Sequence, residues 1–158
     1  MGEVIRNFVG KFNEFQSLEP GKQFFVQATE EEATAAAREY LAENKEQVSR
    51  MIRSAAGVSL EVSDPNVRFR KDEVELSARG GKGFMKVKAT LCAEIVWDGR
   101  PIVNVKSVDV PFVSVTPQKL NSVVEKPLLN VMEIVGSYAE IRSFSVRDGV
   151  VVLEALRK

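Results

Sequence analysis

The sequence of 158 residues contains no histidine and only one cysteine, Cys92. The chain therefore lacks the commonest general base and metal ligand, and one cysteine can form neither an internal disulfide nor a zinc site by itself. The 22 lysines and arginines balance the 22 aspartates and glutamates, so no net charge attracts nucleic acid. No run of about 18 apolar residues occurs, so no segment is expected to span a membrane. We expect no metal site, no cofactor and no nucleic-acid partner.

The residues that are present suit one folded domain. Apolar residues make up 44% of the chain and charged residues 28%, which provides enough apolar side chains for a core and argues against disorder. The length is typical of a single domain, and no internal repeat or linker interrupts it. We predict an N-terminal amphipathic helix and linker over residues 1–21, followed by a single α+β domain over residues 22–158.

Apolar spacing predicts two helices in the first third of the chain. Residues 4–15 place valine, isoleucine and phenylalanine at helical intervals, which predicts a short amphipathic helix with an aromatic face. Thr29 and Glu32 are spaced as a capping box, and the apolar stripe that follows continues to Gly57, a natural stop. This stretch predicts one helix of about 40 Å, at 1.5 Å per residue, with a weak point near Asn44.

Strands dominate the middle of the chain. Residues 85–97 place seven apolar side chains at alternate positions, which predicts a strand of about 45 Å at roughly 3.3 Å per residue. Asp98-Gly99 predicts a hairpin turn into a returning strand over residues 102–115, and a loss of phase at Lys106-Ser107 predicts a bulge there. The glycine-rich segment 79–83, before the long strand, is expected to be a flexible hairpin tip.

Another long helix and a closing hairpin complete the predicted fold. The helix begins at Thr116-Pro117 and contains Pro127, which is expected to kink it. The hairpin over residues 141–156 turns at Asp148-Gly149. Because the run of strands lies between helices, this order predicts an α+β fold with a long, curved antiparallel β-sheet wrapped around or packed on two long helices.

No group of residues forms a recognisable catalytic site. Consecutive helix positions point in different directions, so Glu30, Glu31 and Glu32 do not converge and are better explained by helix capping. Cys92 has no histidine to activate it, and no serine lies in a G-x-S-x-G motif. Segment 79–83 lacks the Walker spacing and precedes a strand. We predict that the protein is not an enzyme; an enzyme based on carboxylates would require two acidic groups that converge in a cleft.

An alternative use of the glycine-rich segment is contact with a membrane surface. Arg79, Lys82, Lys86 and Lys88 lie in or beside it, and basic groups near anionic head groups gain about 1 kcal/mol each. Glu94 and the acidic start of the long helix offset this charge. The favoured interpretation of the segment is a hairpin tip.

The apolar stripes of the helices and of the long strand are the remaining candidate site. Eight residues on these stripes are predicted to face one interior: Leu41, Met51, Ile52, Leu91, Ile95, Trp97, Leu128 and Met132. One interpretation is a closed core, the default for such stripes. The other is an interior left partly open as a ligand tunnel, in which alanines leave space and methionines adapt to varied guests. Periodicity does not separate the two.

Several short segments, taken in order, resemble a known group of domains. Residues 24–32, with the sequence FFVQATEEE, form an apolar strand followed by a threonine and three glutamates. Asp64-Pro65-Asn66-Val67 makes a turn into a strand, and the long strand ends with Trp97-Asp98-Gly99. Val108-Asp109-Val110-Pro111 leads into a helix, and the closing hairpin spans residues 141–156. Over about residues 22–158 this pattern is similar to LmeA-like and YpmS-like extracytoplasmic domains, distant relatives of the tubular lipid-binding (TULIP) superfamily.

The resemblance implies a curved sheet around a helix, an apolar groove, no catalysis and a place at the cell envelope. Such proteins often carry an N-terminal signal or membrane helix, so residues 3–15 are interpreted as the stub of a removed anchor; without such an anchor the protein would be cytoplasmic. The leading hypothesis is a non-enzymatic envelope domain that binds a lipid or another long apolar ligand. The alternative is a closed-core interaction domain whose unidentified protein partner contacts the aromatic face of residues 4–15.

Overall fold

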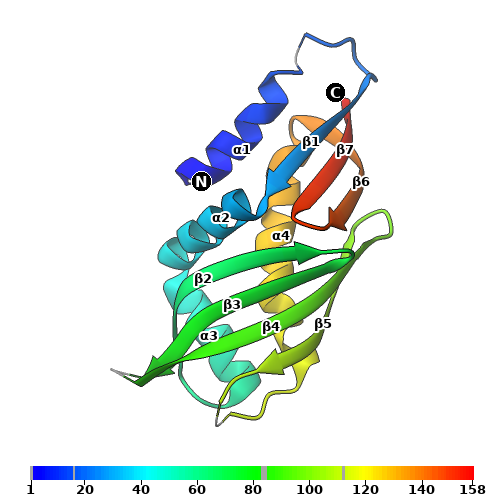
Figure 1. Cartoon of the computed structure of the whole chain (residues 1–158). Helices are drawn as coiled ribbons and strands as arrows, with labels where there is room; N and C mark the ends of the chain where they lie inside the picture. Colours follow the sequence, from blue (N-terminus) through cyan, green and yellow to red (C-terminus); the bar gives the residue numbers. More distant parts are fainter. Residues whose placement is uncertain (1, 16, 83–84, 112) are drawn as a thin grey trace.

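The computed structural model describes residues 2–15, 17–82, 85–111 and 113–158. The elements over these ranges are, in order, α1 (Glu3–Asn13), β1 (Gln23–Thr29), α2 (Glu30–Glu43), α3 (Lys45–Ala56), β2 (Glu61–Arg70), β3 (Glu73–Lys82), β4 (Met85–Trp97), β5 (Pro101–Asp109), the 3₁₀ turn η1 (Pro117–Leu120), α4 (Asn121–Gly136), β6 (Ala139–Arg147) and β7 (Val150–Arg157). Figure 1 shows two sheets placed one beyond the other, with α4 running behind both.

Both sheets are antiparallel, which confirms the predicted α+β class. The smaller sheet has the strand order β1-β7-β6, and the larger sheet has the order β2-β3-β4-β5. The predicted single long sheet on two long helices is therefore corrected to two separate sheets, with four helices that are mostly short. An alternating pattern reports which face of a strand is buried, but it does not report which strand lies beside it. For this reason, the sequence did not predict that the strands divide into two sheets.

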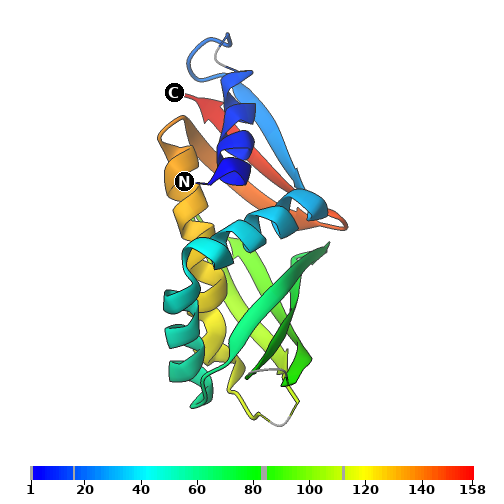
Figure 2. The same cartoon turned by 90° about the vertical axis from the view of Figure 1, so that its left-hand side faces the viewer.

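The predicted single helix after β1 is divided into α2 and α3, which run in different directions (Figure 2). Its start is as predicted, because Thr29 Oγ1 accepts from the Glu32 N–H at 3.1 Å and the Glu32 carboxylate accepts from the Thr29 N–H at 3.2 Å. α2 ends at Asn44, where φ is −123° and ψ is 29°. The Asn44 side-chain amide donates to the Tyr40 carbonyl at 3.0 Å, and asparagine commonly competes with helical hydrogen bonds in this way.

The hairpins of both sheets follow the sequence prediction closely. The β4–β5 and β6–β7 turns each contain a glycine with positive φ. The predicted bulge is confirmed, since Cys92 pairs with Ser107 while Ala93 pairs with Val105, which leaves Lys106 as the extra residue. The returning strand β5 is shorter than expected and ends well before η1.

The glycine-rich segment lies at the end of the β3–β4 hairpin, as predicted, but Arg79 to Lys82 are paired residues of β3 and do not form a flexible tip. Gly80 and Gly81 are buried residues of β3 that pair with Val87 and Lys86 of β4. The same two glycines pair with β2 on their other side. Glycine within a strand permits close approach of neighbouring groups, and here it continues the sheet up to Lys82. The remaining part of the segment, Gly83, lies outside the described residues.

Backbone hydrogen bonds join the two sheets. Asp72, in the turn between β2 and β3, donates its N–H to the Val146 carbonyl of β6 and accepts from the Ile95 N–H of β4, both at 3.0 Å. Its φ of 60° lies in the left-handed region, which aspartate tolerates better than most residues. Gly149 of the β6–β7 turn donates to the Phe69 carbonyl of β2 at 3.0 Å. α4 contacts both β5 and β6 and therefore spans this junction (Figure 1).

The aromatic face of α1 packs onto β1 of the smaller sheet. The Phe12 side chain is 1% exposed and makes edge-to-face contacts with Phe8 and Phe24, at centroid distances of 5.9 and 5.8 Å. The Phe15 ring stacks on Phe24 with a centroid distance of 4.4 Å. The predicted amphipathic helix is thus present, and much of its aromatic face is buried within the chain itself.

Candidate functional site

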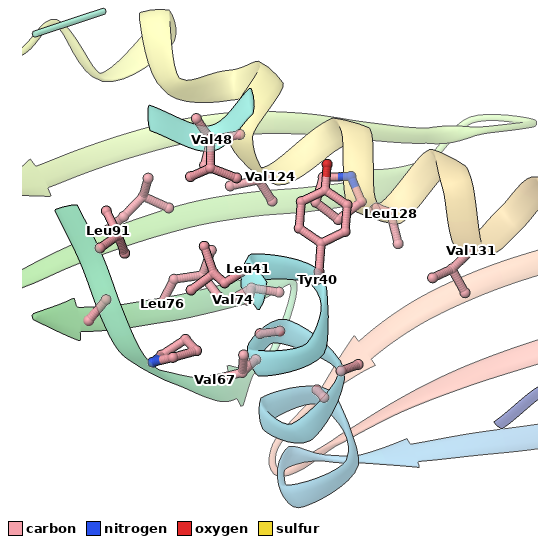
Figure 3. A pocket seen from close by; sticks show the side chains of 18 of the residues that line it. Tyr40, Leu41, Val48, Val67, Val74, Leu76, Leu91, Val124, Leu128 and Val131 are labelled. Carbon is pink, nitrogen blue, oxygen red and sulfur yellow. The ribbon is translucent and has the colours of Figure 1, made fainter. Parts of the chain in front are cut away.

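A cavity of about 440 Å³ lies between the helices and the sheets. Residues of α2, α3 and α4 form one side of it, and residues of β2, β3 and β4 form the other. It extends from the first turns of α1 and the inner face of the smaller sheet to Leu60 and Val115. Figure 3 shows the side chains of Leu41, Leu76 and Leu91 directed into this space from α2, β3 and β4.

The lining of the cavity is mostly apolar. The polar lining residues are Glu32, Glu39, Tyr40, Glu43, Asn44, Ser77, Thr90 and Asn130. Small residues widen the space, since Ala33, Ala36 and Ala37 of α2 and Ala89 of β4 all line it. Ala93 of β4, by contrast, is buried in the core and does not line the cavity. The wall therefore offers extensive apolar surface with few hydrogen-bonding groups.

Six of the eight predicted site residues line the cavity together: Leu41, Ile52, Leu91, Ile95, Leu128 and Met132. They come from α2, α3, β4 and α4, which are far apart in the sequence. Met51 and Trp97 do not line it. Met51 is half-buried on α3 and, unlike its neighbour Ile52, does not border the cavity. Trp97, the last residue of β4, packs against the buried core instead.

Several apolar side chains of the wall are only half-buried although they point inward, whereas others, such as Val67, Val74 and Val124, are fully buried. Along one face of β4, Ile95 is 4% exposed near the junction with the smaller sheet, whereas Leu91 and Ala89 are half-buried. None of the 14 residues of α2 is fully buried. Side chains in a closed core pack densely enough to exclude solvent from one another. The partial exposure of these inward residues therefore agrees with the cavity that they border.

Polar side chains from the helices bond to both edges of the larger sheet. On β2, Thr34 Oγ1 accepts from the Val67 N–H at 3.0 Å and the Glu30 carboxylate accepts from the Phe69 N–H at 2.8 Å. On β5, Asn121 Oδ1 accepts from the Val105 N–H at 2.8 Å. Unpaired edges invite association with other chains, so these contacts protect the sheet while holding α2 and α4 at the cavity wall. Sequence analysis missed them because each joins residues distant in the chain.

α1 forms one end of the cavity and is held there by two glutamates of α2. The Glu39 carboxylate accepts from the Val4 N–H at 3.0 Å, at the positive end of the α1 dipole. Lys11 Nζ lies 2.6 Å from a carboxylate oxygen of Glu32. Partial burial acts to raise the pKa of Glu32, but hydrogen bonds from Lys11 and Thr29, together with the lysine charge, outweigh it and lower the pKa.

Tyr40 adds a phenol to the wall. Figure 3 shows its ring projecting from α2 toward the side of the cavity formed by α4. Burial raises the pKa of the Tyr40 hydroxyl, so the group remains protonated at neutral pH and can donate a hydrogen bond. Asn44 and Asn130 also line the cavity and carry amides that can donate and accept. These three residues can contact the polar end of a ligand without supplying charge.

Four observations outside the cavity bear on the other candidate chemistries. Within the described ranges, no cluster of three or more acidic or cysteine side chains is arranged to hold a metal ion. Cys92 is half-buried on β4 and does not line the cavity. Arg79 and Lys88 are paired across β3 and β4 and both are exposed. Contact of these residues with a membrane surface stays a prediction. No helix in the described part of the chain is long and apolar enough to cross a membrane.

Comparison with known proteins does not assign a family. No protein-family model matches the chain, and no curated protein matches it. The resemblance to LmeA-like and YpmS-like domains therefore stays a prediction from sequence motifs, and a function has to be inferred from the cavity itself.

Proposed function

We propose that this chain is a non-enzymatic domain that binds a lipid or another long apolar ligand in the cavity beneath α2 and α4. The proposal is carried by the cavity, an apolar space of about 440 Å³ around which several inward-pointing side chains, such as Leu41 and Leu91, remain half-buried. This volume lies in the range of roughly 300–1,000 Å³ that is typical of small-molecule sites.

The hydrophobic effect would drive this binding. Each methylene group that leaves water contributes about 0.8 kcal/mol. The wall offers water few hydrogen-bond partners, and cavities of that kind accept apolar guests readily. A hydrocarbon chain lying between Leu41, Leu91 and Leu128 would cover apolar surface that the protein leaves half-exposed.

The alternative function, a closed-core interaction domain, has less support. Its expected partner surface was the aromatic face of residues 4–15, but Phe12 and Phe15 of that face contact Phe24 within the chain. A closed core would also leave the inward leucines of α2 and β4 fully buried, and they are not. A ligand inside the cavity would cover these leucines.

A location at the cell envelope is part of the proposal and rests on the sequence resemblance. Lipid-binding domains act beside membranes, where their ligands are found. Fractionation of cells that express the natural protein should recover it with the envelope. Recovery in the cytosol would contradict the proposed location but would leave ligand binding untouched.

Ligand binding can be tested with a neutral fluorescent reporter, N-phenyl-1-naphthylamine, titrated into delipidated protein. We expect a saturable rise in fluorescence, and native mass spectrometry of the undelipidated protein should detect a co-purified lipid. Ala37→Phe places a ring in the cavity from α2 and should weaken reporter binding by at least about tenfold, equivalent to about 1.4 kcal/mol.

The matched control is Ala35→Phe, which adds the same ring to the same helix at a position that does not line the cavity. This variant should bind the reporter like the wild-type protein. Absence of saturable binding by the wild type would contradict the proposal. Equal binding by the two variants, with unchanged circular dichroism, would also contradict it.

A further inference from the structure

The described residues that line the cavity include acidic side chains but no basic ones. Among the residues that the structure describes, its lining includes three carboxylates, Glu32, Glu39 and Glu43, but no lysine or arginine. Burying an ionised group without a partner of opposite charge costs several kcal/mol. A ligand with a carboxylate or phosphate would therefore enter without a counterion and would approach groups of its own sign.

Two of the three carboxylates are already engaged by α1. Glu32 lies 2.6 Å from Lys11 Nζ, and Glu39 accepts from the Val4 N–H. Glu43 is exposed and lies in the last turn of α2, where no basic residue offsets the negative end of the helix dipole. This arrangement opposes an anionic head group, yet it does not form a converging cluster that would capture a cation.

Resting on the proposed function, we propose that the ligand has an uncharged polar end, such as the hydroxyl or ester group of a neutral lipid. Tyr40, Asn44 and Asn130 supply neutral donors and acceptors in the wall. Such groups match alcohol and ester oxygens, which need hydrogen bonds but no counterion. The hydrocarbon part of the ligand then occupies the apolar remainder of the cavity.

The proposal is tested with three ligands that share one chain length and differ only in head group: dodecanol, dodecanoate and dodecylamine. Each is used to displace N-phenyl-1-naphthylamine from the full chain at about pH 8, where a carboxylic acid is ionised and an aliphatic amine is protonated. Dodecanol should bind at least about tenfold more tightly than dodecanoate, because the acid brings an unpaired negative charge. Dodecylamine should bind within about tenfold of dodecanol, because the carboxylates of the wall can pair with its ammonium group and offset the cost of burying that charge.

A charge-reversal variant at the cavity wall sharpens the test. Glu43→Lys removes one carboxylate and supplies a cation, so the affinity for dodecanoate should rise by roughly three- to tenfold while the affinity for dodecanol stays constant. Glu133→Lys is the matched control, since Glu133 is an exposed residue of α4 that does not line the cavity. Its affinity for dodecanoate should equal that of the wild type.

The outcomes separate this inference from the proposed function. If dodecanoate binds as tightly as dodecanol, the inference of an uncharged head group is wrong, although the cavity would still be a lipid-binding site. Dodecylamine binding more than tenfold tighter than dodecanol would also overturn it, by assigning a cationic head group. An unchanged affinity of Glu43→Lys for dodecanoate would contradict the electrostatic basis. If neither the reporter nor any of the three ligands binds, the proposed function fails and this inference fails with it.

Discussion

The two ends of this molecule bury their apolar residues to different degrees. Where α1 and α4 cover the smaller sheet, residues such as Phe12, Val135 and Ala155 have at most 1% of their surface exposed. Beneath α2 and α3, apolar residues such as Leu41 and Leu91 point inward but remain half-buried around a cavity. The same helix, α4, contributes to both ends (Figure 2). One end therefore provides the dense core, and the other provides a hollow site.

The difference follows from which side chains meet across the interior. At the smaller sheet, the rings of Phe8, Phe12 and Phe24 fill the space between α1 and β1. At the larger sheet, α2 presents alanines to the strands and cannot fill the gap. α2 is held beside β2 by side-chain hydrogen bonds to the strand edge. Aromatic packing is thus found at one end, and side-chain hydrogen bonds to strand edges are found at the other.

The largest expected effect on this comparison comes from truncating one residue at each end. Phe12→Ala should destabilise the protein by about 3–5 kcal/mol, because it opens a void in a packed region. Leu91→Ala should cost only about 1–2 kcal/mol, since its side chain is half-buried and already borders a cavity. Denaturant-induced unfolding, followed by circular dichroism, gives both values. Equal costs would show that the larger sheet is packed as densely as the smaller one.

A smaller effect should follow from removing one bond between α2 and the sheet edge. Thr34→Val keeps the shape of the side chain but removes the oxygen that accepts from the Val67 N–H at 3.0 Å. Val67 is buried, so the unsatisfied N–H should cost about 1–2 kcal/mol in the free energy of unfolding. Thr34→Ser retains the hydroxyl and serves as the control. A Thr34→Val variant as stable as Thr34→Ser would show that this contact does not support the hollow end.

The sequence allowed prediction of local features better than of their assembly. The alternation that ends at Trp97, the bulge at Lys106 and the capping box at Thr29 each depend on neighbouring residues, and all three are present. The division into two sheets depends on pairing between distant strands, which alternation does not encode. The sequence predicted a weak point at Asn44, whereas the structure has a complete break there. Whether a helix continues through an asparagine depends on tertiary contacts, which the local sequence does not report.

Several residues of the candidate site could likewise be predicted, but their arrangement in space could not. Helical and strand periodicity placed Leu41, Leu91 and Leu128 on inward faces, and these residues do meet around the cavity. Periodicity does not measure the distance between two facing elements, so it could not show whether the interior was filled. The bonds from Glu30 and Asn121 to strand edges join residues that are far apart in the chain, and no local pattern reports them. The width of the interior and these long-range hydrogen bonds both depend on the three-dimensional arrangement of the elements.

The smallest expected effect concerns α1, which belongs to the packed end and also forms one end of the cavity. Glu32 bonds to Lys11 at 2.6 Å, and its folded-state pKa is lowered below the ordinary value of 4.5. A lowered pKa means that this carboxylate stabilises the fold fully above about pH 4.5 and loses that contribution as the pH falls through the lower folded-state value. Glu32→Gln should therefore lower the stability at pH 7 by about 0.5 kcal/mol, a modest value because the pair is partly solvated.

The difference between Glu32→Gln and the wild-type protein should shrink as the pH falls below 4.5, since the wild-type carboxyl then becomes protonated as well. Chemical unfolding of both proteins at a series of pH values between neutrality and the acid limit of the fold measures this difference. Glu31→Gln is the control, because Glu31 is exposed in the same helical turn and does not line the cavity. A difference that stays constant with pH would mean that Glu32 acts through its shape. In that case the packing of Phe8 and Phe12 would hold α1 against the cavity, and α1 would be stabilised by apolar contacts like the other elements of the packed end.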